Sequence, residues 1–164
     1  TTVTFSAPGI YQLRLSAPSP LGTSVADLVV TATQTLTAIQ QWRQTHFGTT
    51  ENTGTAADSF DANSDGETNL LEFATGQDPH AATRAVTTLA PAGANFTFTY
   101  TRSKAAAGEG YLFSVEHSDT LGDPWTSVGA GTMTSETDTL ETMQATIPVD
   151  SATRRFVRLK ITPP

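Results

Sequence analysis

The chain has 164 residues, and its 16 acidic and 9 basic side chains give it a formal charge of −7 at pH 7. This charge repels phosphate backbones and therefore argues against nucleic acid as a partner. The chain contains no cysteine, which excludes disulfides and thiolate metal sites and leaves a hydrophobic core or oxygen-bound cations to stabilise the fold. No apolar run approaches the roughly 20 residues of a membrane-spanning helix, so we expect no membrane span.

Residues 1–34 are rich in β-branched side chains and are interrupted by proline and glycine. Three short stretches of this part have the composition of strands, namely 2–5, 10–17 and 25–33. In the second stretch, Tyr11, Leu13 and Leu15 fall on one face, because side chains alternate along a strand. We expect three antiparallel strands, which form only part of a β-sandwich.

An amphipathic helix is predicted next, because apolar side chains recur at steps of three and four residues over 36–47. Gly48 is a suitable residue to end this helix. A polar stretch follows, and a second, short helix is predicted over Asn69–Thr75, where Gly76 would end it. Residues 35–82 are therefore expected to form a helix–loop–helix segment.

The loop before the second helix has the spacing of an EF-hand calcium loop. It runs from residue 61 to residue 72 with the sequence DANSDGETNLLE, which places glycine at the sixth position and glutamate at the twelfth. A calcium ion needs six to eight oxygen ligands, and alternate residues of a tightly curled backbone can supply them. The expected ligands are the backbone carbonyl of Glu67 and the side chains of Asp61, Asn63, Asp65, Asn69 (directly or through water) and Glu72.

The acidic side chains of this loop would repel one another without a cation. Like charges about 4–5 Å apart repel by roughly 3–4 kcal/mol at an effective dielectric constant near 20. Ca²⁺ would remove this repulsion, and it is preferred over Mg²⁺, which tolerates a flexible all-protein cage poorly. The simpler alternative is a polar turn that caps the following helix. Paired EF-hands normally carry an aliphatic residue at position eight, which here is Thr68, so we expect a single structural site.

Residues 83–164 return to the alternation of strands, most clearly in Asn95–Thr101. Further strands are predicted at 84–89, 111–117, 125–128, 140–147 and 155–161. Together they suggest a small β-sandwich. The expected fold is mainly β, with two β-sandwich-like modules at 1–34 and 83–164, the first incomplete, joined by a helix–calcium loop–helix segment at 35–82.

Several parts of the chain resemble known families. The acidic loop resembles the single calcium loops of thrombospondin type 3 and dockerin-like repeats, whose pattern is D-x-N-x-D-G-x-x-N-x-x-D/E. A C-terminal region common in large secreted bacterial proteins is similar to four segments here, WRQTHFG, FDANSDGETNLLEFATGQDP, YLFSVEHSDTLGDPW and RRFVRLKITP. The last strands of PKD or immunoglobulin-like domains resemble the segments TVTFSAPGIYQLRLSA and SVADLVVTA. These resemblances imply a secreted or cell-surface bacterial location, diverse upstream domains and no activity of the region itself.

Other candidate sites are weaker. None of the three histidines adjoins a glycine-flanked serine, so we expect no catalysis. His117 could pair with Asp119, but this pair alone does not make a site. Glu116, Asp119 and Asp123 could hold a second cation, although the chemistry of an acidic turn explains them adequately.

The function expected from these features is that of a non-catalytic, calcium-stabilised spacer, anchor or interaction module in a longer secreted polypeptide. Its partners would be other domains of the same polypeptide, or a neighbouring chain at the edge of the N-terminal sheet. One alternative is a carbohydrate-binding accessory module of a polysaccharide-degrading enzyme, with Trp42, Tyr111 or Trp125 stacking on a cell-surface glycan, although core packing is the commoner role of such side chains. Another alternative is an adhesin or filament subunit whose N-terminal sheet accepts a strand from a neighbour.

Overall fold

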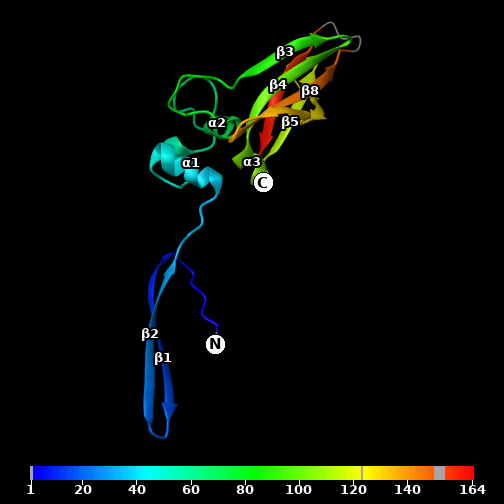
Figure 1. The fold of residues 1–164 in the computed structure, drawn as a ribbon. Helices are drawn as coiled ribbons and strands as arrows, with labels where there is room; N and C mark the ends of the chain where they lie inside the picture. Colours follow the sequence, from blue (N-terminus) through cyan, green and yellow to red (C-terminus); the bar gives the residue numbers. More distant parts are fainter. Residues whose placement is uncertain (1, 123, 150–153) are drawn as a thin grey trace. The chain divides into compact units, whose positions relative to one another are not determined.

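The computed structural model describes residues 2–122, 124–149 and 154–164. It confirms the predicted class, because strands far outnumber helices and every sheet is antiparallel (Figure 1). The chain divides into two compact units, 1–36 and 37–164, which are described separately. Among the described residues, none of the helices combines the length and the apolar character that crossing a bilayer requires.

The first unit is a single β-hairpin. Its strands pair along their whole length, from Gly9 opposite Ala32 to Ser19 opposite Gly22, and are β1 (Gly9–Ser19) and β2 (Gly22–Ala32). The strand expected at 2–5 is wrong, because these residues form no strand and pair with neither strand of the hairpin. The ring of Phe5 packs on that of Tyr11 with 4.4 Å between centroids, and the Tyr11 hydroxyl donates to the carbonyl of Ala7 at 2.6 Å.

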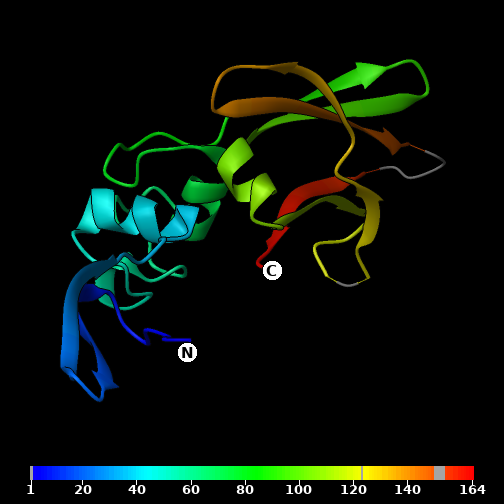
Figure 2. The ribbon, with the colours of Figure 1, turned by 60° about the horizontal axis from the view of Figure 1, so that its bottom comes forward.

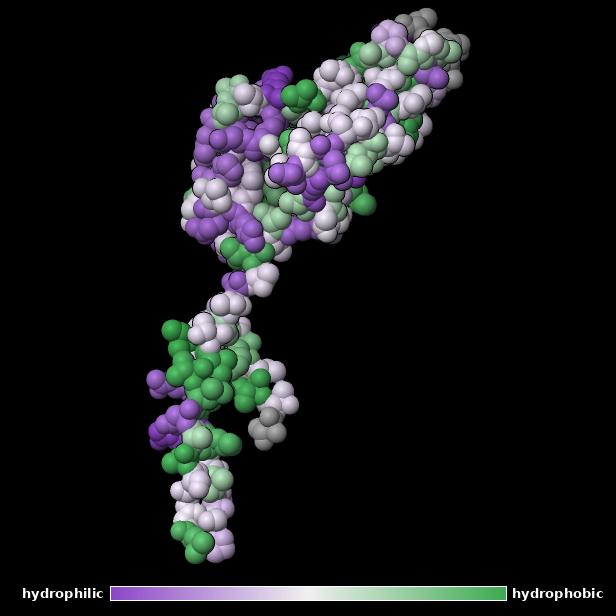
Figure 3. All heavy atoms as spheres, viewed as in Figure 1, coloured by the Kyte–Doolittle hydropathy of each residue, from purple (hydrophilic) through white to green (hydrophobic). Residues whose placement is uncertain are grey.

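The two faces of the hairpin differ in polarity. Residues that are paired directly across the strands lie on the same face, which gives one face an almost unbroken apolar set of Tyr11, Leu13, Leu15, Ala17, Ala26, Leu28 and Val30. The other face carries the ion pair of Arg14 and Asp27, with 2.7 Å between nitrogen and oxygen. Leu28 is 59% exposed, and Figure 3 shows hydrophobic residues along the surface of the hairpin. The apolar face is therefore largely open to solvent.

The second unit contains two antiparallel sheets (Figure 2). The first has the order β3 (Thr87–Ala92), β4 (Asn95–Ser103), β8 (Leu140–Pro148) and β7 (Thr132–Glu136). The second has the order β6 (Thr126–Gly129), β5 (Leu112–Ser118) and β9 (Phe156–Thr162). The predicted strands of this unit are found with small shifts of their ends, whereas β7 was not predicted, because all five of its residues are exposed and it lacks an apolar alternation.

The helices begin and end where local side chains allow. They are α1 (Ala38–Phe47), the short 3₁₀ helix η1 (Gly54–Ala56), α2 (Asn69–Thr75) and α3 (Lys104–Gly108). Thr37 and Gln40 form a reciprocal capping box at the start of α1. Gly48 and Gly76 end α1 and α2 in the left-handed conformation, with φ of 71° and 79°, as their positions in the sequence predicted.

Both sheets and the helices of the second unit share one hydrophobic core. Tyr100 of β4 and Phe113 of β5 stack across the sheets with 6.3 Å between ring centroids. The helices contribute buried side chains to the same core, namely Ile39, Phe73, Ala74 and Ala106. Burial of each large side chain contributes roughly 1.5–3 kcal/mol, so α1 and α2 are held mainly by tertiary packing. The division of the chain at 34/35 and 82/83 stays a prediction.

A charged cluster joins β5 and β9 on the outside of their sheet. Arg158 donates from Nε and Nη2 to Oε2 of Glu116, at 2.9 and 2.7 Å. The guanidinium also lies over the ring of Trp125 at 4.0 Å from its centroid, and Lys160 approaches Glu116 at 3.6 Å. The hydrogen bonds from Arg158 are the main reason that the pKa of Glu116 lies below its usual value.

We expect Glu116→Gln to lower the free energy of unfolding by about 1 kcal/mol at pH 7. Because the folded-state pKa of Glu116 is lowered, its contribution is present above the unfolded-state pKa and is lost as pH falls through the folded-state value. Urea unfolding at pH 7 and at progressively lower pH measures this difference, with the exposed Glu51→Gln as the control. A cost for Glu116→Gln that did not shrink with acidification would show that the charge is not what stabilises the cluster.

Candidate metal centre

The acidic loop of residues 61–72 curls tightly before α2. Ser64 and Gly66 both have positive φ, at 61° and 94°. Asp61 accepts hydrogen bonds from the backbone N–H of Asp65 at 3.3 Å and of Gly66 at 2.8 Å. The side-chain oxygen of Asn63 accepts from Asp65 N–H at 3.0 Å. Backbone N–H groups of residues 65 and 66 thus curl around the side chains of Asp61 and Asn63. This tight turn requires the positive φ of Gly66, which glycine adopts without strain.

Three of the six predicted ligand residues carry a buried oxygen that has no hydrogen-bond partner among the described residues. These atoms are Oδ2 of Asp65, Oδ1 of Asn69 and Oε2 of Glu72. Leaving a buried acceptor unpaired costs about 1–3 kcal/mol, and more for a charged group. Such atoms in native proteins call for a missing partner, and carboxylate and amide oxygens are the ligands that hard cations prefer.

Glu72 is the most constrained member of this set. Its side chain is 0% exposed, and its Oε1 accepts one hydrogen bond, from Nδ2 of Asn63 at 2.9 Å. Burial, followed by the negative charges of Asp65, Asp61 and Glu67, raises the pKa of Glu72 to about 7. The hydrogen bond from Asn63 acts in the opposite direction but is outweighed. The loop therefore concentrates negative charge around a carboxyl group that has lost most of its water.

Glu67 plays two separate parts in the loop. Its carboxylate is bound outside the predicted ligand set, since Oε2 accepts from Nε2 of Gln77 and from the backbone N–H of Ala85, both at 2.8 Å. Its backbone carbonyl is the group that the sequence assigns to the metal. The side chain is thereby an anchor between the loop and the chain that leads to β3.

Asn69 closes the other end of the loop. It is 1% exposed, and its Nδ2 donates to the carbonyl oxygens of Thr55 at 2.9 Å and Ala57 at 2.8 Å. Its backbone N–H donates to the carbonyl of Phe60 at 2.8 Å. Since both amide hydrogens are used by backbone carbonyls, only the amide oxygen remains for a ligand.

Residues far along the chain complete the surroundings of the loop. Arg84 donates from Nη2 to the backbone carbonyl of Asp65, and Asn63 donates from Nδ2 to the carbonyl of Ala81 at 2.7 Å. Sequence reasoning missed both contacts and the anchoring role of Gln77. The stretch 77–85 has no alternation or helical period that could have indicated where it packs.

Carboxylates alone do not define a metal centre here. Within the described ranges, no three His, Cys, Asp or Glu side chains are grouped closely enough to hold a metal ion by themselves. Three of the six predicted ligands lie outside such a grouping, because they are the amides of Asn63 and Asn69 and the backbone carbonyl of Glu67. The repulsion that raises the pKa of Glu72 also opposes a closer approach of the acidic side chains. The ligand set and the ion stay predictions.

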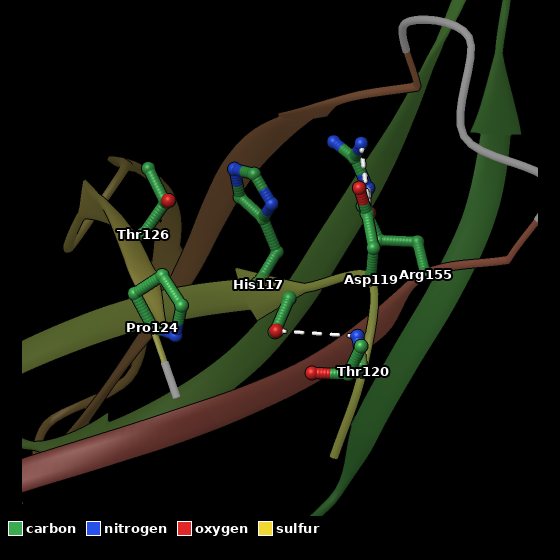
Figure 4. A pocket seen from close by; sticks show the side chains of 7 residues that line it. His117, Asp119, Thr120, Pro124, Thr126 and Arg155 are labelled. Carbon is green, nitrogen blue, oxygen red and sulfur yellow. Dashed lines mark hydrogen bonds and ion pairs between the residues drawn. The ribbon is translucent and has the colours of Figure 1, made fainter. Parts of the chain in front are cut away.

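The second acidic turn is used differently from what its sequence suggested. Glu116 is bound by Arg158, and Asp119 by Arg155 with 3.1 Å between nitrogen and oxygen, while Asp123 lies outside the described residues. A hollow of about 320 Å³ lies at this end of β5 and is lined by His117 and Asp119. In Figure 4 the Asp119 side chain meets Arg155 rather than His117. No pairing of His117 with Asp119 is formed.

The aromatic side chains considered as sugar platforms differ in accessibility. Tyr111 is buried in the core beside Phe73, with 5.5 Å between ring centroids. Trp125 lies under the guanidinium of Arg158. Trp42 is only partly buried and packs at the edge of the core. Exposure of Tyr111, which would have favoured a glycan surface on the sandwich, is therefore not found.

Comparison of the chain with protein-family models, with curated proteins and with solved structures finds no match. The basis for a functional proposal is therefore the chemistry of the residues described above.

We expect Asn69→Ala to lower the free energy of unfolding by about 2 kcal/mol, because the buried amide of Asn69 would no longer form its partly buried hydrogen bonds to the carbonyls of Thr55 and Ala57. Asn69→Asp, which keeps the volume but not the donor, should cost at least as much in the presence of a chelator. Asn95→Ala, at the start of β4, is the control. Denaturant unfolding checks the values, and a change smaller than about 0.5 kcal/mol would contradict the assigned role of Asn69.

Proposed function

We propose that residues 61–72 bind one Ca²⁺ ion and that the chain is a non-catalytic, calcium-stabilised structural module of a longer secreted protein. The observation that carries this proposal is the set of buried, partnerless oxygens on Asp65, Asn69 and Glu72. They occur at positions 5, 9 and 12 of a twelve-residue loop that has glycine at position 6. A divalent cation is the partner that would satisfy all three oxygens and the surrounding negative charge together.

Calcium suits this loop better than magnesium. The predicted set mixes carboxylates, amides and one backbone carbonyl on a curled backbone, which matches the flexible coordination of Ca²⁺ at 2.3–2.6 Å. Mg²⁺ demands a nearly octahedral arrangement at 2.0–2.1 Å and keeps several of its waters. A set of six protein ligands spread over 61–72 is therefore poorly suited to magnesium.

The proposed role of the ion is to hold the loop and the core together. Glu72 lies next to Phe73 and Ala74, which are buried in the core shared by both sheets. Glu67 is tied to Gln77 and Ala85 on the other side of α2. Binding to the folded loop and not to the unfolded chain would add about 2.7 kcal/mol of stability at a hundredfold excess of Ca²⁺ over Kd.

Calorimetry of the full chain in Ca²⁺ and in excess chelator tests the proposal. We expect Ca²⁺ to raise the melting temperature by roughly 10 °C, and Mg²⁺ at the same concentration to raise it much less. Glu72→Gln should abolish most of this rise, and it should cost little in chelator because it removes a buried charge. Glu51→Gln, outside the loop, is the matched control. If chelator left both melting and protease resistance unchanged, the calcium role would be wrong.

The absence of catalysis is part of the proposal and has its own support. The hollow of Figure 4 contains His117, but the carboxylate of Asp119 that could orient this imidazole is engaged by Arg155. The carboxylates of the acidic loop, residues 61–72, are assigned to the calcium ion rather than to acid–base catalysis. A spacer or anchor requires no reactive group.

A second candidate function, that of an interaction module, is favoured by the exposed apolar face of β1 and β2. An isolated two-stranded hairpin is marginally stable in water and gains stability when another surface covers its apolar face. We propose that this face meets another domain of the same polypeptide or a neighbouring chain, as in an adhesin or filament. Leu28 and Val29 provide a paired test, because they are adjacent, 59% and 61% exposed, and on opposite faces.

We expect the purified chain to self-associate as its concentration rises, because no other partner is present to cover the apolar face. Leu28→Glu should suppress this association, whereas Val29→Glu, with similar exposure on the polar face, should leave it largely intact. Sedimentation velocity over a wide range of concentrations measures both variants. Equal effects of the two substitutions, or a chain that stays monomeric throughout, would count against an interface on this face.

A further inference from the structure

A groove of about 490 Å³ lies among α1, the end of α2, the start of α3 and the turn between β7 and β8. It is larger than the hollow at the end of β5, and α1 and α3, which border it, are visible in Figure 2. Its size falls within the roughly 300–1,000 Å³ of small-molecule sites in proteins. All of its lining residues belong to the second unit.

The aromatic surface of the groove is the indole of Trp42. This side chain is partly buried, and its ring lies 5.9 Å from that of Phe73 and 5.7 Å from that of Phe47, measured between centroids. Phe73 also lines the groove but is only 3% exposed, so it supports the indole from below and offers little surface itself. The ring of His46 also lies 4.9 Å from the indole, so Trp42 offers a ligand the part of its ring that these side chains leave uncovered.

Leu140 also lines the groove and packs close to the end of α2, where a glycine leaves room for it. A Cβ atom on Gly76 would lie 2.2 Å from Cδ2 of Leu140, so a side chain at position 76 would displace Leu140. Gly76 also needs its left-handed conformation, with φ of 79°, to end α2. The part of the groove at Leu140 is thus set by the packing of β8 against the end of α2.

The rim of the groove is polar without a dominant charge. Lys104 is paired with Glu136 at 2.6 Å, and Asp138 lies nearby in the turn before β8. Burial lowers the pKa of His46, which favours its neutral form at pH 7. Gln41 adds an amide to the same rim. Because the charges on the rim largely offset one another, the groove favours a neutral ligand. The charge of −7 on the whole chain also opposes the binding of polyanions.

We propose that this groove binds one or two neutral pyranose units of a polysaccharide. A pyranose ring has an aliphatic face that stacks on an indole and a rim of hydroxyls that amide, carboxylate and ammonium groups can bind. A proline-rich peptide is less well matched, because grooves for such peptides are lined by several aromatic walls, and here a single indole is accessible. None of the six proposed calcium ligands lines this groove, although Gln77, which lines it, also donates to Glu67 of the loop.

Fluorescence titration of the full chain, in excess Ca²⁺, tests this assignment. In Trp125→Phe, Trp42 is the one remaining tryptophan and reports directly on the groove. We expect cello-, xylo-, manno- or chito-hexaose to change its emission in a saturable way, with Kd on the order of 0.1–1 mM. A proline-rich peptide serves as the competing probe.

Variants of the groove separate stacking from folding. Trp42→Phe, which keeps an aromatic side chain in the packing, should weaken binding by about tenfold as measured by calorimetry, while Trp125→Phe leaves it unchanged. Asp138→Ala, in the turn before β8, should weaken binding without changing the melting temperature. Binding of no hexaose up to about 10 mM, equal binding by Trp42→Phe, or binding of the peptide instead would each overturn the proposal. The melting temperature in Ca²⁺ reports on the calcium loop separately.

Discussion

The buried carboxylate of Glu72 is the constraint on which the centre of the second unit depends. Glu72 sits in α2, a helix of seven residues that is too short to be stable alone, and its neighbours Phe73 and Ala74 are core residues. The position of α2 is set by this core, so the carboxylate cannot move out to water without withdrawing Phe73. The acidic loop must therefore satisfy Glu72 where it lies, and Asn63 supplies one hydrogen bond for two oxygens.

The same constraint explains why a long irregular stretch is ordered around α2. Side chains of the loop donate to or accept from backbone groups on both sides, as Asn69 does with Thr55 and Glu67 does with Ala85. Arg84 adds a positive charge at the carbonyl of Asp65. These bonds replace the ladders that strands would provide, and they connect the loop to the start of β3. An ion bound in the loop would thus stabilise contacts well beyond its own ligands.

The helices and strands that were predicted correctly are those whose bounds are set by nearby residues in the sequence. The bounds of α2 followed from the loop spacing and Gly76, and β4 from the alternation in Asn95–Thr101. The capping box of Thr37 was readable in the sequence but was overlooked. By contrast, β7 is an exposed edge strand without an apolar pattern, and α3 has only five residues, so neither carries a periodic signal. The contacts of Arg84 are set by tertiary structure and have no local signature.

In the hairpin of the first unit, the strands form as the local sequence predicts, but their apolar side chains are not buried. Its two strands of 11 residues pair fully and place an apolar set on one face, yet Leu28 on that face is 59% exposed. The ion pair of Arg14 and Asp27, whose side chains are 68% and 61% exposed, is screened by water and contributes far less than the entropy lost on ordering both strands. Phe5 covers Tyr11 on the apolar face, and covering the rest of that face with another surface would add the hydrophobic stabilisation that the hairpin lacks. The exposed apolar face of this hairpin is therefore the observation on which the proposed partner surface rests.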